Sequence, residues 1–244
     1  MPLTRLDKLL ADMGEGTRSE VKKLIKNGRV KVDGKTTSDG AFKVDAETSA
    51  ISVDGRELSY SRFTYLMLNK PSGVISATED NSQKVVTDLL EPPYSKMGLF
   101  PVGRLDKDTA GLLILTNDGD FAHSSLSPKR HVPKTYYVEA KGHFSSDIAI
   151  HFNEGIVIDG GYKCKSAFLD IIRLEADGIT ARLTITEGKF HQIKRMFKAE
   201  GGVVTLLRRI AFGEIKLDES LAEGEIRLLT DDELKYISEL KEKR

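Results

Sequence analysis

Apolar residues near the start of the chain recur every three or four positions, which is the spacing of one face of an α-helix. This repeat predicts a helix over residues 4–13, with Thr4 as its cap. Thr17 and Glu20 then form a capping-box pattern that predicts a second helix, ending at residues 27–28. The members of the first repeat are Leu6, Leu9, Leu10 and Met13.

Alternating apolar and polar residues follow these two helices. Residues 30–32 and 51–53 predict short strands, and an Asp-Gly pair after each strand predicts a tight turn. Two helices and a few strands make a module of roughly 50 residues, which is enough to fold independently. The polar stretch 56–62 resembles a linker, so we place the first domain at residues 1–58.

The pattern changes from residue 63 onward, where many short strands alternate with few helices. Helices are expected at 83–90, at 191–200 and after a final capping box at Thr230 and Glu233. Such interleaving without long parallel crossovers predicts an α+β domain around a mixed, largely antiparallel sheet, at residues 63–244. The expected strands cover residues 65–68, 112–115, 135–140, 168–174, 180–186, 203–209 and 225–228.

Charge is balanced overall, with 37 basic and 37 acidic residues, but it is distributed unevenly. Residues 1–45 hold ten Lys or Arg against seven Asp or Glu, and residues 189–209 hold six against one. Two basic segments on a neutral chain favour a polyanionic partner, although solvated basic faces are the simpler alternative. Cys164 is the single cysteine, and no apolar run is long enough for a signal segment or a membrane span. We therefore expect a cytoplasmic protein without a membrane partner.

The segment 103–119 carries the strongest chemical signal, because a charged loop between glycines runs directly into an apolar strand. Loops held against rigid strands are common positions for reactive groups. Asp106 lies there between Arg104 and Lys107, which makes it a candidate reactive carboxylate kept ionised by cations. An isolated Asp in such a loop is more often a turn residue. We interpret Asp108 and Asp118 as residues that stabilise the loop structure.

The first domain resembles an S4 RNA-binding domain over about residues 3–50. The resemblance rests on Arg-Leu-Asp-Lys-Leu-Leu at 5–10, Thr-Arg-Ser-Glu at 17–20 and Gly-Arg-Val-Lys-Val-Asp-Gly at 28–34. It implies contacts to RNA phosphates, which position an RNA without reading its sequence. A helical module with a solvated basic face is the alternative. The expected RNA-binding residues are Arg5, Lys8, Arg18, Lys22, Lys23 and Arg29.

The second domain resembles the RsuA-type pseudouridine synthases from about residue 65 to residue 229. Gly-Arg-Leu-Asp at 103–106, followed by Gly-Leu-Leu-Ile-Leu-Thr-Asn-Asp-Gly at 111–119, is the most specific part of the match. His-Gln-Ile-Lys-Arg-Met-Phe at 191–197 looks most like the bacterial small-subunit ribosomal RNA synthases of this type.

This resemblance implies a role for five residues. Asp106 falls on the essential aspartate, Tyr136 on the tyrosine that packs against the target base, and Lys194 on the basic partner of the aspartate. Arg104 and Ile193 fall on substrate-contacting positions beside the pocket. Lys70 and Pro71 match a motif that we interpret as mainly structural, and we read His191 as RNA-facing or structural.

The implied reaction converts a uridine within ribosomal RNA, or within a small-subunit assembly intermediate, to pseudouridine. No atoms are gained or lost, so neither a cofactor nor a metal is expected, and a monomer suffices. The attack of Asp106 on C1′ of the ribose, its attack on C6 of the base, and its assistance of glycal formation all stay open. The alternatives are a non-catalytic ribosome-associated RNA-binding protein, a large-subunit ribosomal RNA pseudouridine synthase, and a carboxylate-dependent nucleoside hydrolase. The last would normally need a second acid or base.

Overall fold

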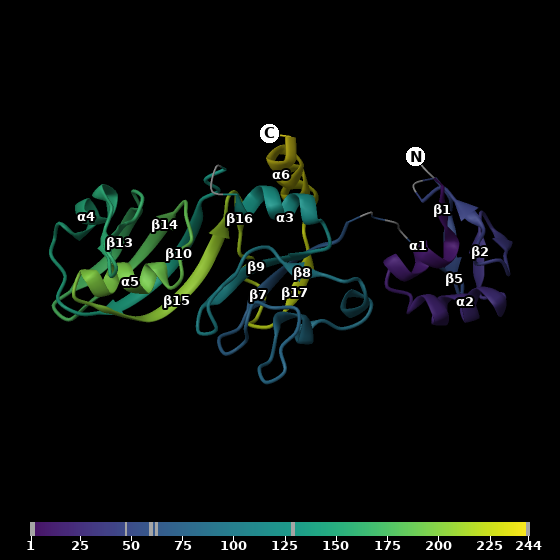
Figure 1. The fold of residues 1–244 in the computed structure, drawn as a ribbon, viewed down its shortest axis with the longest axis horizontal. Helices are drawn as coiled ribbons and strands as arrows, with labels where there is room; N and C mark the ends of the chain where they lie inside the picture. Colours follow the sequence, from purple (N-terminus) through teal and green to yellow (C-terminus); the bar gives the residue numbers. More distant parts are fainter. Residues whose placement is uncertain (1–2, 47, 59–60, 62, 128–129, 243–244) are drawn as a thin grey trace. The chain divides into compact units, whose positions relative to one another are not determined.

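The computed structural model describes residues 3–46, 48–58, 61, 63–127 and 130–242. By its internal contacts the chain divides into two compact units, whose elements are labelled in Figure 1. The first unit combines residues 1–64 with 87–100, and the second combines 65–86 with 101–244. The domain limits expected above, 1–58 and 63–244, therefore stay a prediction, because segment 87–100 groups with the first unit and part of the expected linker lies outside the described residues.

Two helices and a small antiparallel sheet form the first unit. Its sheet has the strand order β3-β2-β5-β6, and β1 pairs separately with β4. The apolar faces of both helices and of the sheet strands are buried in one core. The elements are β1 (Thr4–Arg5), α1 (Leu6–Asp12), α2 (Arg18–Lys26), β2 (Val30–Val32), β3 (Lys35–Thr36), β4 (Lys43–Val44), β5 (Ile51–Val53), β6 (Arg56–Leu58) and the 3-10 helix η2 (Tyr94–Lys96).

The sequence predicted the start of α2 correctly and the start of α1 wrongly. Thr17 and Glu20 make the reciprocal capping box before α2. Thr4, by contrast, lies in β1 and does not cap α1, which starts at Leu6. The first backbone N–H groups of α1 instead donate to the carbonyl groups of Phe42 and Gly40, so the neighbouring loop replaces a side-chain cap.

The second unit is built around a curved, mixed sheet and also holds a separate two-stranded sheet. The main order of the large sheet is β13-β14-β10-β15-β9-β7-β17, and along this path of described strands only the β15–β9 pairing is parallel. This arrangement confirms the expected α+β class with a largely antiparallel sheet. The elements are β7 (Tyr65–Lys70), β9 (Ala110–Thr116), α3 (Gly119–Leu126), β10 (Lys134–Lys141), α4 (Ile148–Glu154), β11 (Val157–Ile158), β12 (Tyr162–Lys163), β13 (Phe168–Glu175), β14 (Gly178–Ile185), α5 (Gln192–Ala199), β15 (Val203–Phe212), β16 (Ile215–Lys216), β17 (Ile226–Leu228) and α6 (Asp231–Glu242). The 3-10 helix η1 (Val86–Leu89) and the strand β8 (Phe100–Pro101) each fall across the boundary between the two units.

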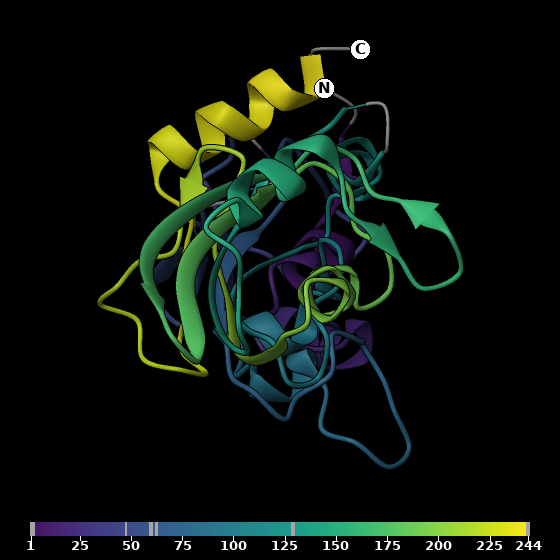
Figure 2. The ribbon, with the colours of Figure 1, turned by 90° about the vertical axis from the view of Figure 1, so that its left-hand side faces the viewer.

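Helices α4 and α5 contact β13 and β15 respectively, and the strands bend around the side on which α5 lies (Figure 2). Helices α3 and α6 pack against each other. None of the helices within the described ranges is long and apolar enough to cross a bilayer.

The parallel contact between β15 and β9 is narrow and tightly packed. Only Arg208 with Ala110 and Arg209 with Gly111 are in register. A Cβ atom at Gly111 would lie 2.3 Å from the carbonyl oxygen of Arg209, and the φ angle of Gly111 is +100°. Both facts require glycine here, because a side chain would separate the two strands.

One expected helix is absent and two helices were missed. The segment 83–90 is not an α-helix, because Val85 forms an isolated parallel bridge with Ile75 and only a 3-10 turn follows, at η1. Helices α3 and α4 were not predicted, since both are short and carry weak apolar periodicity. Asp118 caps α3 by accepting from the N–H of Phe121, in agreement with the structural role given to it.

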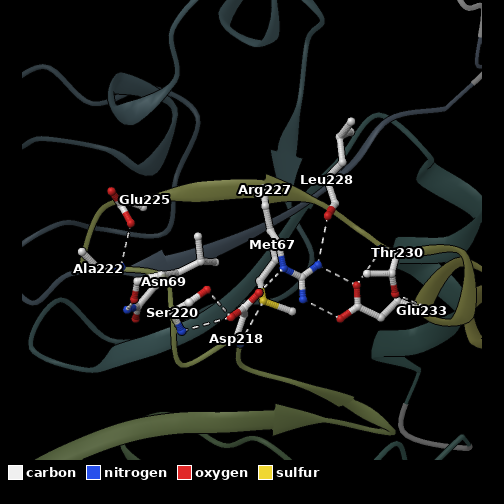
Figure 3. A network of polar contacts seen from close by, with 11 residues as sticks. Met67, Asn69, Asp218, Ser220, Ala222, Glu225, Arg227, Leu228, Thr230 and Glu233 are labelled. Atoms are coloured by element: carbon white, nitrogen blue, oxygen red, sulfur yellow. Dashed lines mark hydrogen bonds and ion pairs between the residues drawn. The ribbon is translucent and has the colours of Figure 1, made fainter.

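An ion-pair network joins β17 to the first turn of α6 (Figure 3). Arg227 donates to Asp218 at 2.7 Å and to both carboxylate oxygens of Glu233 at 2.7 and 2.9 Å. Glu233 also accepts from the N–H of Thr230, which completes the predicted capping box. Hydrogen bonds from Ser220, and then from Arg227, lower the pKa of Asp218 to about 2.

We expect Arg227→Met to lower the thermal midpoint by roughly 2–6 °C at pH 7, because two carboxylates lose their partner. The pKa of Asp218 is about 2 when folded and 3.8 ordinarily, lowered first by Ser220 and then by Arg227. The part of this stabilisation that Arg227 supplies is complete above pH 3.8 and is lost as the pH falls through 2. The deficit of the variant should therefore shrink below pH 4 in calorimetry. A deficit that stays constant down to pH 2 would contradict this assignment.

Candidate active site

An open pocket of about 770 Å³ lies in the second unit. Its lining brings together all five residues that the sequence analysis assigned to catalysis and substrate contact, from three separate segments of the chain. They are Arg104, Asp106, Tyr136, Ile193 and Lys194.

Asp106 stands at the start of a tight turn that leads into β9. The N–H of Thr109 donates to the carbonyl oxygen of Asp106 at 3.0 Å, which closes the turn. The preceding residue, Leu105, exchanges two hydrogen bonds with the hydroxyl group of Ser76 at 2.9 and 3.0 Å. The N–H of Gly73 donates to the carbonyl oxygen of Lys107 at 2.8 Å. The carboxylate is therefore presented by a loop that is fastened on both sides.

Lys70 supplies the innermost attachment of this loop. Its side chain is completely buried at the end of β7, and its ammonium group donates to the carbonyl oxygens of Pro71 and Thr109 at 2.9 Å each. A third, longer contact reaches the carbonyl oxygen of Lys107 at 3.4 Å. Burial lowers the pKa of Lys70 to about 8. These contacts explain the structural role expected of Lys70, because its side chain ties the end of β7 to the loop of Asp106.

Lys194 lies between two carboxylates. Its ammonium group is 3.4 Å from Asp106 Oδ2 and 2.5 Å from Asp108 Oδ1. The hydrogen bond from Lys194 lowers the pKa of Asp108. The sequence predicted the pairing of Lys194 with Asp106 but not the closer contact with Asp108, because spacing along a chain gives no distance across a loop.

His191 also approaches the candidate acid. Its Nε2 atom is 3.8 Å from Asp106 Oδ1, so the side chain takes part in the site itself. The φ angle of His191 is +51°, a left-handed conformation directly before α5. Non-glycine residues rarely adopt this conformation, and they concentrate at functional sites. This backbone feature has no sequence signature, which is why the proximity was missed.

Tyr136 and Ile193 form apolar surface in the pocket. Tyr136 belongs to β10 and is 7% exposed, while Ile193 lies in the first turn of α5 and is 4% exposed. A register shift in the β10–β15 pairing falls between Thr135 and Tyr136. Such a bulge changes the direction of nearby side chains. Arg104, in contrast, is an exposed member of the lining.

Three of the six expected RNA-binding residues of the first unit surround one buried carboxylate. Arg5 donates to both oxygens of Asp7, at 3.0 and 2.8 Å, and the cations of Arg18 and Lys22 lie 3.8 and 3.9 Å from it. Asp7 is 1% exposed, so one buried carboxylate holds these three exposed cations close together. Lys8 and Lys23 are exposed on the helices. Arg29 differs, because its guanidinium group is paired with Asp54 at 2.7 Å.

Comparison with known proteins identifies both units. The profile of the RNA pseudouridylate synthase family matches residues 64–199, and that of the S4 domain matches residues 4–48. The chain belongs to the RNA pseudouridine synthase family. It is therefore an isomerase that carries an N-terminal S4 domain.

Full-length relatives support this assignment. The chain is 49% identical over 235 residues to the uncharacterized RNA pseudouridine synthase YtzG of Bacillus subtilis (strain 168), covering 96% of this chain and 98% of the relative. It is 42% identical over 234 residues to the ribosomal small subunit pseudouridine synthase A of Vibrio cholerae, covering 96% and 99%. A crystal structure of a pseudouridylate synthase is similar at 36% identity and a TM-score of 0.65, covering 96% and 99%.

The lining of this synthase pocket includes the carboxylate of Asp106, the cations of Arg104 and Lys194, the imidazole of His191 and the phenol ring of Tyr136. Among the residues that the structure describes, no group of three His, Cys, Asp or Glu side chains has the arrangement of a metal site. The arrangement suits chemistry at a carboxylate held beside a planar ring.

We expect Lys70→Met to reduce conversion of RNA by the synthase about 10- to 100-fold, because the loop of Asp106 loses its attachment and small displacements of reacting groups are costly. Single-turnover rates measure this effect. Lys141→Met, at the exposed end of β10, serves as the matched control. Equal rates for both variants would show that the contacts of Lys70 do not position the carboxylate.

Proposed function

We propose that this synthase converts a uridine of small-subunit ribosomal RNA to pseudouridine, with Asp106 as the reacting carboxylate. The observation that carries the proposal is the placement of Asp106 in an open pocket that the ring of Tyr136 also lines, 3.4 Å from the ammonium group of Lys194. Relatives that bear the small-subunit name align over nearly the whole chain at about 40% identity. This similarity supports the choice of the RNA.

The reaction breaks the bond between N1 of uracil and C1′ of the ribose, and joins C5 to the same carbon. The proton at C5 is released and N1 gains a proton, so that atoms and electrons balance. Asp106 is the only carboxylate of the pocket-lining residues that also contacts both Lys194 and His191. It is 28% exposed, so it is open to an RNA while remaining partly shielded from water.

The neighbouring residues receive distinct roles in this proposal. Tyr136 packs against the everted uracil, because its ring lines the pocket from the buried side. Lys194 places a positive charge 3.4 Å from the carboxylate. Ile193 gives the base an apolar contact, and exposed Arg104 occupies the stack that the uridine leaves. These contacts offset the few kcal/mol that eversion of a base costs.

The S4 domain serves as the anchor for folded RNA. The cations gathered around Asp7 meet phosphates, and such contacts position an RNA through its backbone. We propose that the synthase acts as a monomer in the cytoplasm, on ribosomal RNA or on a small-subunit assembly intermediate.

Asp106→Asn should abolish conversion while RNA affinity changes less than about threefold, because the amide keeps the shape of the carboxylate but cannot react. Conversion is measured by mapping pseudouridine in small-subunit and large-subunit ribosomal RNA after incubation with each protein. Asp120→Asn, on the exposed start of α3, is the matched control. Conversion by Asp106→Asn would remove this residue from the mechanism, and conversion confined to large-subunit RNA would refute the proposed substrate.

The triple variant Lys8→Ala, Lys22→Ala, Lys23→Ala should weaken RNA binding and reduce its logarithmic salt slope by about 2, because each phosphate contact contributes roughly 0.7–0.9. Titrations at several salt concentrations measure the slope. A variant with Lys31, Lys35 and Lys43 changed to Ala removes equal charge from the strands of the same unit. Equal losses in both triples would show that α1 and α2 do not form the anchor.

A further inference from the structure

Two aromatic rings stack on each other at the rim of the pocket. The ring centroids of Phe190 and His191 are 3.8 Å apart and their planes differ by 20°. Both residues belong to the lining of the pocket. Phe190 is 75% exposed, which is the largest exposure among the large apolar side chains of the described residues. Its outer face is therefore open to solvent.

The loop that carries this ring pair is held by a buried amide. Gln192 is 3% exposed, accepts from the N–H of Lys189 at 2.9 Å and donates to Glu187 at 2.8 Å. Glu187 in turn accepts from the hydroxyl group of Tyr162 at 2.7 Å and from the N–H of Lys165 at 2.9 Å. These hydrogen bonds hold residues 187–192 in one conformation, and Phe190 is exposed in that conformation.

The ring pair extends from the reacting group to the exterior. The inner ring, His191, has its Nε2 atom 3.8 Å from Asp106 Oδ1, whereas the outer ring faces solvent. Tyr136 contacts the pocket interior and is nearly buried, so it is distinct from this outer surface. Lys189 and Lys194 line the same pocket as Phe190 and give it positive charge. The ammonium group of Lys189 lies 4.9 Å from the ring centre of Tyr162.

We propose that Phe190 and His191 form a stacking platform for the unpaired nucleobase adjacent to the target uridine. When one nucleotide enters the pocket, its neighbour along the strand reaches the rim, within one backbone step of Asp106. An exposed aromatic face with nearby cations is the surface on which unstacked bases of RNA bind. This inference rests on the proposed function and adds to it a subsite for the flanking nucleotide.

The protein-side test compares Phe190→Leu, Phe190→Tyr and the control Phe168→Leu, whose residue is 68% exposed on the edge strand β13. Each variant converts a small-subunit ribosomal RNA transcript, and kcat and KM are measured separately. Phe190→Leu should lower kcat/KM about 5- to 100-fold, mainly through KM, since stacking on one ring contributes this much. Phe190→Tyr should keep nearly full activity and Phe168→Leu all of it.

The RNA-side test uses a fragment centred on the converted uridine, with an abasic site in place of either neighbour. At one of the two positions, the abasic site should slow the wild-type synthase as much as Phe190→Leu does, and should slow Phe190→Leu no further. Additive losses at both positions, or a Phe190→Leu variant as active as Phe168→Leu, would overturn the platform while leaving the proposed function intact. A wild-type synthase that converts no uridine of the transcript would instead refute the proposed function, and the platform with it.

Discussion

The buried ammonium group of Lys70 is the contact on which the geometry of the site depends. Taking a cation out of water is costly, and burial accordingly lowers the pKa of Lys70 to about 8. The cost is offset by the carbonyl oxygens of Pro71, Lys107 and Thr109, the last two of which follow Asp106 in its loop. Because these acceptors are backbone atoms, Lys70 holds the path of the chain itself, and the hydrogen bonds of Ser76 and Gly73 then complete the attachment.

A second constraint is the sharing of Lys194 by two carboxylates. In the structure the ammonium group lies closer to Asp108 than to Asp106. Asp108 is exposed and Asp106 is more shielded, so the shorter pair gains less from its attraction than the distance alone suggests. A substrate that excludes water from the pocket would strengthen both interactions. Lys194 therefore ties the carboxylate of Asp106 to that of Asp108 through one ammonium group.

Much of this site was accessible from the sequence, because the loop, the strand and the basic helix each carry a local pattern. Asp106, Tyr136 and Lys194 line one pocket, and the roles given to them stay a prediction. What the sequence could not supply was contact between segments. The approach of His191 depends on a left-handed backbone angle, and the closeness of Asp108 depends on how the loop folds back.

The fold shows the same division. The capping box before α2 was predictable because Thr17 and Glu20 act within four residues. The start of α1 was not, since carbonyl groups about 35 positions away replace the expected cap. The prediction of a helix at 83–90 was wrong for a similar reason. Val85 pairs with Ile75 in a parallel bridge, and this contact overrides the helical spacing of the apolar residues.

The narrow β15–β9 contact has a mechanical consequence. Asp106 is attached to the half of the sheet that contains β7 and β9, whereas Tyr136 and Lys194 come from the half that contains β10 and α5. Two register pairs join these halves, and Gly111 permits their close approach. The β15–β9 contact thus sets where Asp106 lies relative to Tyr136 and Lys194. A bulkier residue at position 111 would push the two halves of the sheet apart and so shift Asp106 away from Tyr136 and Lys194.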